Sequence, residues 1–456
     1  MLLGLRQNPI TSFNRMPLLK KLFWVYFLLL IFEGALRKWV APQLSAPLLL
    51  VRDPVALWII AEAYRSGRLP KRWSVVSGVL AAALLCLCAV QIIVGDNPWV
   101  AAVYGLRSYL LPFPVAFIMG ENLDAKDLRN FGICTLWLLL PLTALEVAQY
   151  LAAPGSFLNK GASEGGGQIY YVEGHVRASG TFSFDVGPTN YVPMAAAFVF
   201  YGLINEKFAR KWLLWAATAA VILSIPVIGA RTLAFDLAGV VACAGIAAIF
   251  GTSQLLKAVK IVLPCLVLYL LVLQLPVFSR ASISFKERFK NANASEGGAT
   301  RIVVANRTVV PIVGQLERTD FTSNPIGAGM GQGAAAITKL MSGRVYFAAG
   351  EGELSRLMTE LGPIPGLGLM FFQAALAIIL IARALARTRN REPLALLLVP
   401  VTLTSLVFAI LEQPTEQGFM VISVAFTLAA LKLGKRAAAP VLPPSAARLR
   451  ARLSTR

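Results

Sequence analysis

The chain has 456 residues, of which 57% are hydrophobic and only 14% are charged, and its net charge is +20. This apolar composition excludes an ordinary soluble globular protein. The positive charge would suggest a nucleic-acid partner in a soluble chain. Because no nucleic-acid-binding motif is present, we expect no nucleic-acid partner here.

Apolar runs long enough to cross a bilayer recur along the chain. They predict an all-α polytopic integral membrane protein with about twelve transmembrane helices, because a membrane barrel would show short alternating strands instead. The first run leads into FEGALRKW rather than a cleavage site, so we expect it to be retained. The expected spans are 19–36, 44–64, 74–94, 98–119, 131–151, 190–205, 212–230, 232–250, 257–275, 363–382, 394–411 and 418–433.

Short basic loops predict the orientation. YRSGRLPKRW, NEKFARKW and RALARTRNREP are rich in Lys and Arg, and so are the N-terminal segment and the tail. With twelve spans these segments all fall on one face of the membrane, and the positive-inside rule makes that face cytoplasmic. Both termini are then expected to be cytoplasmic.

This topology divides the chain into six parts, and two long polar segments fall on the outer face. The second of them contains many Lys and Arg residues, Arg301 among them, which indicates an anionic partner. The parts are N-terminal helices (1–151), a first outer loop (152–189), central helices (190–275), a large outer loop (276–362), C-terminal helices (363–433) and a disordered basic tail (434–456).

Arg177 lies in the first outer loop, in EGHVRASGTFSFDVGPTNY, just before an apolar run. At this depth a guanidinium can bind phosphate oxygens with two parallel hydrogen bonds, although an arginine that only snorkels to the interface fits equally well. His175, the only histidine in the chain, is expected to be a loop residue rather than a catalytic base. One histidine and cysteines confined to apolar runs predict no metal site, and we expect no cofactor.

Arg231 follows a glycine in a tight turn, in IPVIGARTLAFDLAGV, between two apolar runs. An ionisable residue at membrane depth indicates function. An internal pair with Asp236, which would only stabilise the helical hairpin, is the alternative.

Carboxylates gather at the end of the large outer loop, in AAGEGELSRLMTELGPIPGLGLM. Glu353, Arg356 and Glu360 fall on one helical face, and Glu351 lies just before them. A carboxylate in a partly dry site can act as a general base; an ion-paired helix end is the alternative. The nearby NPIGAGMGQGAA lacks a Walker ending, and we expect a flexible loop near a polar ligand. Near the N-terminus, the four-residue spacing of Glu33 and Arg37 predicts an ion pair.

Four of these segments occur in an order that resembles the O-antigen polymerase and O-antigen ligase family of bacterial surface-polysaccharide enzymes. They are RASGTFSFDVGPTNYVPMAAAF, IGARTLAFDLAGV, NPIGAGMGQG and ELGPIPGL, and the resemblance covers roughly 170–380. It implies a glycosyltransferase-C-like helical fold with two periplasmic loops in the bacterial inner membrane.

The resemblance also implies a reaction. Such enzymes take a glycan from an undecaprenyl-diphosphate carrier at the periplasmic face without a metal or another cofactor. By this resemblance Arg177 and Arg231 bind the diphosphate and Arg231 stabilises its developing charge, with Arg301 as a further binding candidate. Glu351 and Glu353 are the candidates for catalytic base. Expected partners are the lipid-linked glycan, the bilayer and other polysaccharide-assembly proteins.

One departure from the pattern bears on the acceptor. Ligases carry a histidine–asparagine pair that begins nine residues before the glutamate of their last motif, whereas this chain has Glu351 and Gly352 there. This favours a polymerase or an exopolysaccharide transferase over a lipid A-core ligase. A transporter or flippase of lipid-linked glycan and a member that has lost activity remain alternatives.

Overall fold

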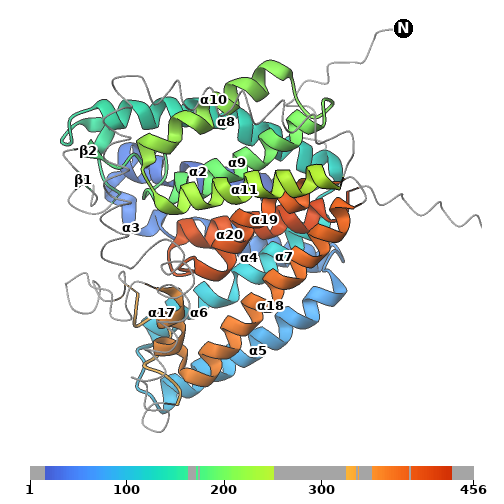
Figure 1. The fold of residues 1–456 in the computed structure, drawn as a ribbon. Helices are drawn as coiled ribbons and strands as arrows, with labels where there is room; N and C mark the ends of the chain where they lie inside the picture. Colours follow the sequence, from blue (N-terminus) through green and yellow to red (C-terminus); the bar gives the residue numbers. More distant parts are fainter. Residues whose placement is uncertain are drawn as a thin grey trace, which may run out of the picture.

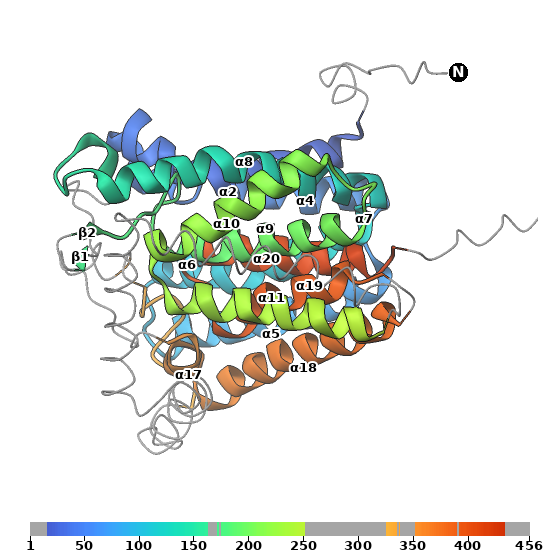
Figure 2. The same ribbon diagram turned by 45° about the horizontal axis from the view of Figure 1, so that its top comes forward.

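A computed structural model describes residues 16–162, 171–172, 175–250, 325–334, 337, 352–389 and 392–433. In this part of the chain the helices run roughly side by side in one bundle (Figures 1 and 2). The elements are α2 (Leu18–Ala35), α3 (Ser45–Leu48), α4 (Arg52–Arg65), α5 (Lys71–Ile93), α6 (Trp99–Leu110), α7 (Pro112–Asn122), α8 (Ala125–Leu151), β1 (Tyr171–Val172), β2 (His175–Val176), α9 (Val186–Ile204), α10 (Lys211–Ile228), α11 (Arg231–Ile249), α17 (Glu353–Leu361), α18 (Pro363–Thr388), α19 (Leu394–Leu403) and α20 (Pro414–Ala430).

The helices occupy the apolar runs of the sequence. Every expected span except 257–275, which lies outside the described residues, coincides with one or two of these helices. Seven helical stretches among the described residues are long and apolar enough to cross a membrane. The chain is therefore a multi-pass α-helical membrane protein, and the number of twelve spans remains a prediction. The seven stretches are Pro42–Arg65, Lys71–Ile93, Trp99–Asn122, Ala125–Leu151, Lys211–Ile228, Arg231–Ile249 and Pro363–Thr388.

Helix α20 lies at the centre of the bundle. It packs against α7, α9 and α19, and every residue from 417 to 430 is buried. A helix that is apolar on all sides needs an apolar environment around it, and the neighbours of α20 provide one. This explains why α20 shows no amphipathic pattern in the sequence.

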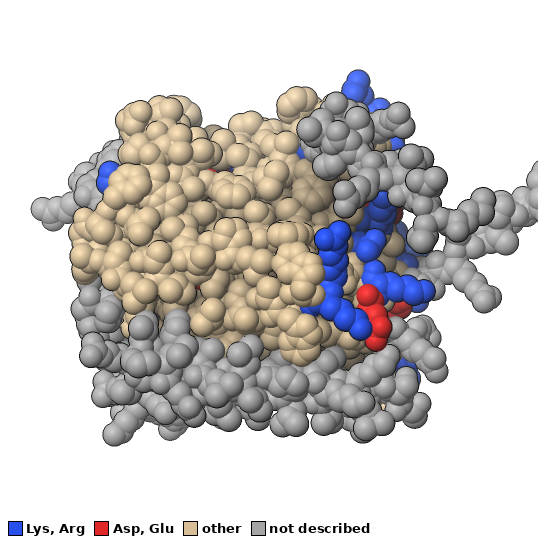
Figure 3. All heavy atoms as spheres, turned by 90° about the horizontal axis from the view of Figure 1, so that it is seen from above, with Lys and Arg blue, Asp and Glu red and all other residues tan. Residues whose placement is uncertain are grey.

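Helix α5 lies at the periphery and is apolar for the opposite reason. Its side chains Val75, Val79 and Ile93 are exposed, although they would be costly to hydrate. Figure 3 shows another outer face, on which residues other than Asp, Glu, Lys and Arg cover most of the surface and Lys and Arg gather at one end. A bilayer around the bundle accounts for both features.

The short loops that are basic in the sequence meet at one end of the bundle, here called the basic end. Lys and Arg side chains in these loops and in the adjoining helix ends bind carboxylates or backbone carbonyls of neighbouring segments at this end. The contacts include Lys20 with Asp124 (2.8 Å), Arg129 with the carbonyl of Phe208 (2.9 Å), Lys432 with the carbonyl of Glu121 (2.6 Å) and Arg387 with the carbonyl of Leu431 (2.9 Å). The arrangement therefore keeps the basic loops on one side, as the sequence predicts.

The opposite end holds α17 and the β1–β2 hairpin (Figure 2). The hairpin pairs Tyr171 with Val176 and Val172 with His175. The chain then reaches α9, which begins at Val186, four residues before the expected start of the central helices at 190. The first outer loop therefore ends at 185, whereas the sequence predicts that it ends at 189. We call this end of the bundle the polar end.

Candidate functional site

The glycine-rich loop 325–334 lies directly on the C-terminal end of α17. The amide of Ala328 donates to the carbonyl of Thr359 (2.7 Å), and the amide of Gly329 donates to the carbonyl of Glu360 (3.2 Å). Two segments that are separate in the sequence, NPIGAGMGQG and ELGPIPGL, therefore form one unit.

Two amide side chains hold this loop, one from the last turn of α5 and one from the α5–α6 connection. Gln91 Nε2 donates to the carbonyls of Ile326 (2.6 Å) and Glu360 (2.7 Å), while Gln91 Oε1 accepts from the amide of Met330 (2.9 Å). Asn97 Nδ2 donates to the carbonyl of Met330 (3.2 Å). The only sequence signal for these roles is the position of a polar amide at the end of an otherwise apolar run.

The backbone of the loop requires glycine. Gly327, Gly329 and Gly331 have φ values of +76°, +117° and +81°, which side chains rarely adopt. A Cβ on Gly331 would lie 2.1 Å from the carbonyl oxygen of Ala101. Backbone and amide hydrogen bonds together with close packing attach 325–334 to its neighbours, and the sequence expectation of a flexible loop included none of these contacts.

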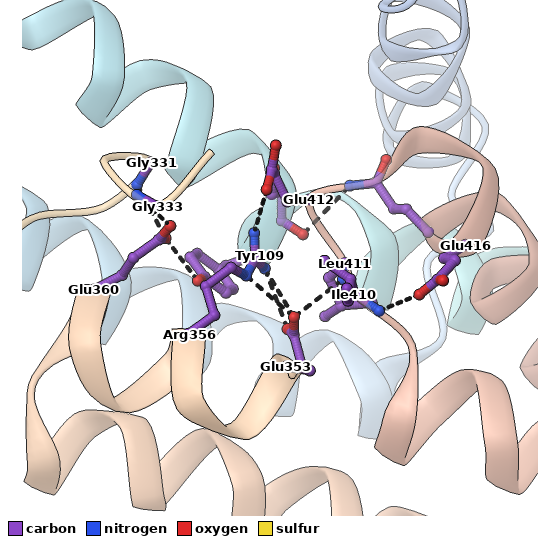
Figure 4. Close-up of polar contacts among 12 residues, drawn as sticks. Tyr109, Gly331, Gly333, Glu353, Arg356, Glu360, Ile410, Leu411, Glu412 and Glu416 are labelled. Carbon is purple, nitrogen blue, oxygen red and sulfur yellow. Dashed lines mark hydrogen bonds and ion pairs between the residues drawn. The ribbon is translucent and has the colours of Figure 1, made fainter. Parts of the chain in front are cut away.

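Glu360 is the centre of this unit, and it is completely buried. Its Oε2 accepts hydrogen bonds from the Tyr109 hydroxyl (2.8 Å) and the amide of Gly331 (3.0 Å), and its Oε1 accepts from the amide of Gly333 (3.0 Å). Figure 4 shows the carboxylate between the loop and Tyr109. Glu360 therefore organises the loop.

Arg356 lies one turn earlier on the same face of α17. Its guanidinium forms two hydrogen bonds with the Glu353 carboxylate (3.1 and 3.2 Å), lies 3.6 Å from Glu412 and stacks over the Tyr109 ring at 5.1 Å (Figure 4). The predicted common face of α17 is thus confirmed, and Glu353 and Glu412 bind Arg356.

The electrostatics of this cluster follow from burial. Burial raises the pKa of Glu353, and the charge of Arg356 partly offsets this. Burial also raises the pKa of Glu412 to about 7, again against the effect of Arg356. For Arg356 burial alone would lower the pKa, but the surrounding carboxylates, Glu353 first, raise it. Arg356 is therefore a permanent cation that holds two acidic groups.

The arrangement favours a structural role for Glu353. Its side chain is 1% exposed, and besides Arg356 it accepts a hydrogen bond from the amide of Leu411 (3.3 Å). A carboxylate enclosed in this way cannot contact an incoming hydroxyl without opening of the ion pair. The other candidate base, Glu351, lies outside the described residues, and so does Arg301.

Arg177 lies at the polar end, between β2 and α9. Its Nη1 is 3.0 Å from Asp185 Oδ2, and its side chain is 30% exposed. An intramolecular carboxylate holds the guanidinium while part of it stays accessible. His175 lies in β2, where its backbone pairs with Val172.

Arg231 is the first residue of α11. Gly229, with φ of +62°, ends α10, so the tight turn predicted from the sequence is confirmed. Asp236, the alternative partner proposed for Arg231, accepts a hydrogen bond from Thr404 Oγ1 (2.6 Å) after α19. This contact between helices is not apparent from the sequence, because the two residues are 168 positions apart.

The segments that hold Arg177 and Arg231 lie close together. Ala178, next to Arg177, packs in one buried cluster with Val227 near the end of α10. Because α17 also lies at this end (Figure 2), the resembling segments lie on the side of the bundle opposite the basic end.

A second buried network lies beside α17, at the start of α4. Glu33 pairs with Arg37 (3.5 Å), as predicted, and also with Arg52 (3.1 Å). Arg107 pairs with Asp53 (3.0 Å). The contacts with Arg52 and Arg107 are not apparent from the sequence, because they join helices at variable sequence separations.

Comparison of the chain with protein-family models finds no match, and no curated protein matches it either.

Proposed function

We propose that this chain is an inner-membrane glycosyltransferase that polymerises or transfers polysaccharide repeats from undecaprenyl diphosphate at the periplasmic face, with both termini cytoplasmic. The observation that carries the proposal is the gathering of the resembling segments at the end of the bundle opposite the basic loops. By the positive-inside rule that end faces away from the cytoplasm.

The proposed reaction joins an acceptor hydroxyl to the anomeric carbon of the donor glycan. The new C–O bond forms as the bond to the diphosphate breaks, and the diphosphate leaves with the electron pair. The acceptor proton passes to a base or to water. Arg177 and Arg231 would bind the diphosphate oxygens, and Arg231 would stabilise the leaving charge.

One observation favours a polymerase or an exopolysaccharide transferase over a lipid A-core ligase: Glu351 and Gly352 stand where ligases carry a histidine–asparagine pair. Glu360, near the end of α17, holds the glycine-rich loop through the amides of Gly331 and Gly333. Glu351 remains the candidate base, and the enclosed Glu353 is assigned to the binding of Arg356.

The test is transfer by the purified chain in nanodiscs supplied with undecaprenyl-diphosphate-linked repeats. Arg177→Ala and Arg231→Ala should each lower kcat/KM by about a hundredfold or more, as when a group that stabilises transition-state charge is lost. Lysine should rescue poorly, because a point charge does not reproduce the two-pronged guanidinium contact. Arg65→Ala is the control, since that side chain is 75% exposed on another part of the surface.

Three results would contradict the proposal. Normal turnover by both alanine variants would reduce the arginines to interface roles. Failure of the unmodified protein to join repeats would remove the enzyme assignment. Movement of intact lipid-linked glycan between leaflets without a new glycosidic bond would identify a flippase instead.

A further inference from the structure

Helix α2 is followed by a π-helical turn, Leu36–Val40, and side chains of this turn bind the segment that follows Arg177. Lys38 Nζ donates to Ser179 Oγ (2.5 Å) and to the carbonyl of Gly180 (3.3 Å), and Arg37 Nη1 donates to Ser183 Oγ (2.8 Å). These contacts join parts of the chain more than 140 residues apart. Gly34, Arg37 and Lys38 are together called the α2 clasp.

Lys38 is an unusual residue for this position, because it is only 1% exposed. In the part of the chain that the structure describes it has no ion pair, and its hydrogen-bond acceptors are neutral oxygens. Burial lowers the pKa of Lys38 to about 7, and the neighbouring Arg37 adds to this effect. Because burial of a lysine side chain costs free energy, we expect its hydrogen bonds to Ser179 and Gly180 to have a structural or functional role.

Gly34 brings the two segments into direct contact. A Cβ on Gly34 would lie 2.2 Å from the backbone carbon of Phe182 and 2.5 Å from the carbonyl oxygen of Thr181. Thr181 Oγ1 also donates to the carbonyl of Ile31 in α2 (2.6 Å). The backbone of 181–183 therefore lies against the helix, with no room for any side chain at position 34.

Gln149, from α8, holds the same segment from another side. Its Oε1 accepts from the amide of Gly180 (2.8 Å), and its Nε2 donates to the carbonyl of Gly180 (3.3 Å). Gly180 has φ of +55°, so this bend also depends on glycine. Both backbone groups of Gly180 are thus fixed between α8 and Lys38.

Segment 179–183, which these contacts hold in place, lies between the two members of one ion pair. Arg177 lies two residues before it and Asp185 two residues after it, and their side chains meet at 3.0 Å. We propose that the α2 clasp is a positioning device: Gly34, Arg37 and Lys38 fix segment 179–183 and so set the place of the Arg177 guanidinium for a lipid diphosphate. The ligand named here rests on the proposed function, but the positioning does not.

The experiment compares Lys38→Met, Lys38→Arg and Ser179→Ala in the full chain in nanodiscs. Hydrogen exchange of the Gly180 and Phe182 amides reports the segment directly, because both are hydrogen bonded in it. Lys38→Met should speed their exchange about tenfold, the change expected on loss of two buried hydrogen bonds. Lys211→Met, at a 77% exposed side chain, is the control.

The kinetic readout separates positioning from general damage. Lys38→Met should raise KM for the lipid-linked donor about tenfold with little change in kcat, as expected for loss of binding common to ground state and transition state. It should add little to Arg177→Ala in a double-mutant cycle, because both act through one guanidinium. Lys38→Arg, which keeps a hydrogen-bond donor at this position, should recover part of the loss.

Unchanged amide exchange in both Lys38→Met and Ser179→Ala would overturn the clasp. Additive effects of Lys38→Met and Arg177→Ala would overturn its action through Arg177. If Arg177→Ala leaves kcat/KM for the lipid-linked donor unchanged while Lys38→Met speeds exchange, the proposed function fails but the clasp stands. Should Lys38→Met not accumulate, Ser179→Ala gives the same exchange test with a smaller change.

Discussion

At the scale of single residues, the buried carboxylate of Glu360 depends on its hydrogen bonds. Burial of a charge is costly unless donors satisfy it. Here Tyr109, Gly331 and Gly333 supply three donors to the two oxygens. The residue therefore couples α17, α6 and the glycine-rich loop in one contact.

We predict that Glu360→Gln destabilises the protein by about 1–3 kcal/mol, the cost of an unsatisfied buried polar group. The reason is geometric: each carboxylate oxygen accepts from a backbone amide, so either orientation of the new side-chain amide sets a donor against a donor. Thermal unfolding in detergent measures the change. Glu206→Gln, at a 67% exposed side chain, is the matched control, and equal melting temperatures for the two variants would refute the assigned role.

At the scale of elements, the loop 325–334 and helix α6 are in backbone contact. A Cβ on Gly105 would lie 2.3 Å from the amide nitrogen of Gly331. Because both positions are glycine, the loop can lie directly on the helix, and Glu360 can reach the amides beyond it. The close approach of the loop to α6 therefore requires glycine at both Gly105 and Gly331.

Gly105→Ala should destabilise the protein by about 1–3 kcal/mol, the usual cost of overpacking. Gly78→Ala, in α5, has no atom within 4 Å of the new Cβ and should be neutral or stabilise by up to about 1 kcal/mol. Thermal unfolding of the two variants under the same conditions decides the matter. A destabilised Gly78→Ala together with an unaffected Gly105→Ala would show that the loop does not lie on α6.

At the scale of the whole molecule, charge is sorted between the two ends. The basic loops meet at one end, where Lys and Arg bind neighbouring carbonyls and carboxylates. The polar end instead holds buried networks, in which cations and carboxylates satisfy one another, as at Arg356 and Glu33. The two ends therefore differ in how their charged groups are arranged.

This sorting predicts the labelling of two cysteines in a variant that lacks the five native ones. Gly155→Cys, after α8, should react with a membrane-impermeant maleimide in intact cells whose outer membrane admits the reagent. Ser66→Cys, after α4, should react only once the inner membrane is permeabilised, because its loop lies at the basic end. Both positions are exposed. The reverse pattern would invert the orientation and place the polar end in the cytoplasm, where the proposed donor site could not face the periplasm.

The sequence by itself determined the helical class and most of the helix positions. Length and apolarity of a run are local properties, and a helix that crosses lipid must satisfy its own backbone, so the runs map onto helices. The turn before Arg231 and the pair of Glu33 with Arg37 were predictable for the same reason, since each depends on residues at most four apart. The common face of Glu353, Arg356 and Glu360 is also local.

Only the tertiary structure decided which partners these residues have. Glu360 binds amides 27 and 29 residues away and a tyrosine 251 residues away, and Gln91 reaches the loop from more than 230 residues. Lys38 meets Ser179 across 141 residues. Hydropathy selects the helices, but it does not select their neighbours. The neighbours follow from packing of whole helices, and buried polar groups must then find donors and acceptors wherever that packing places them.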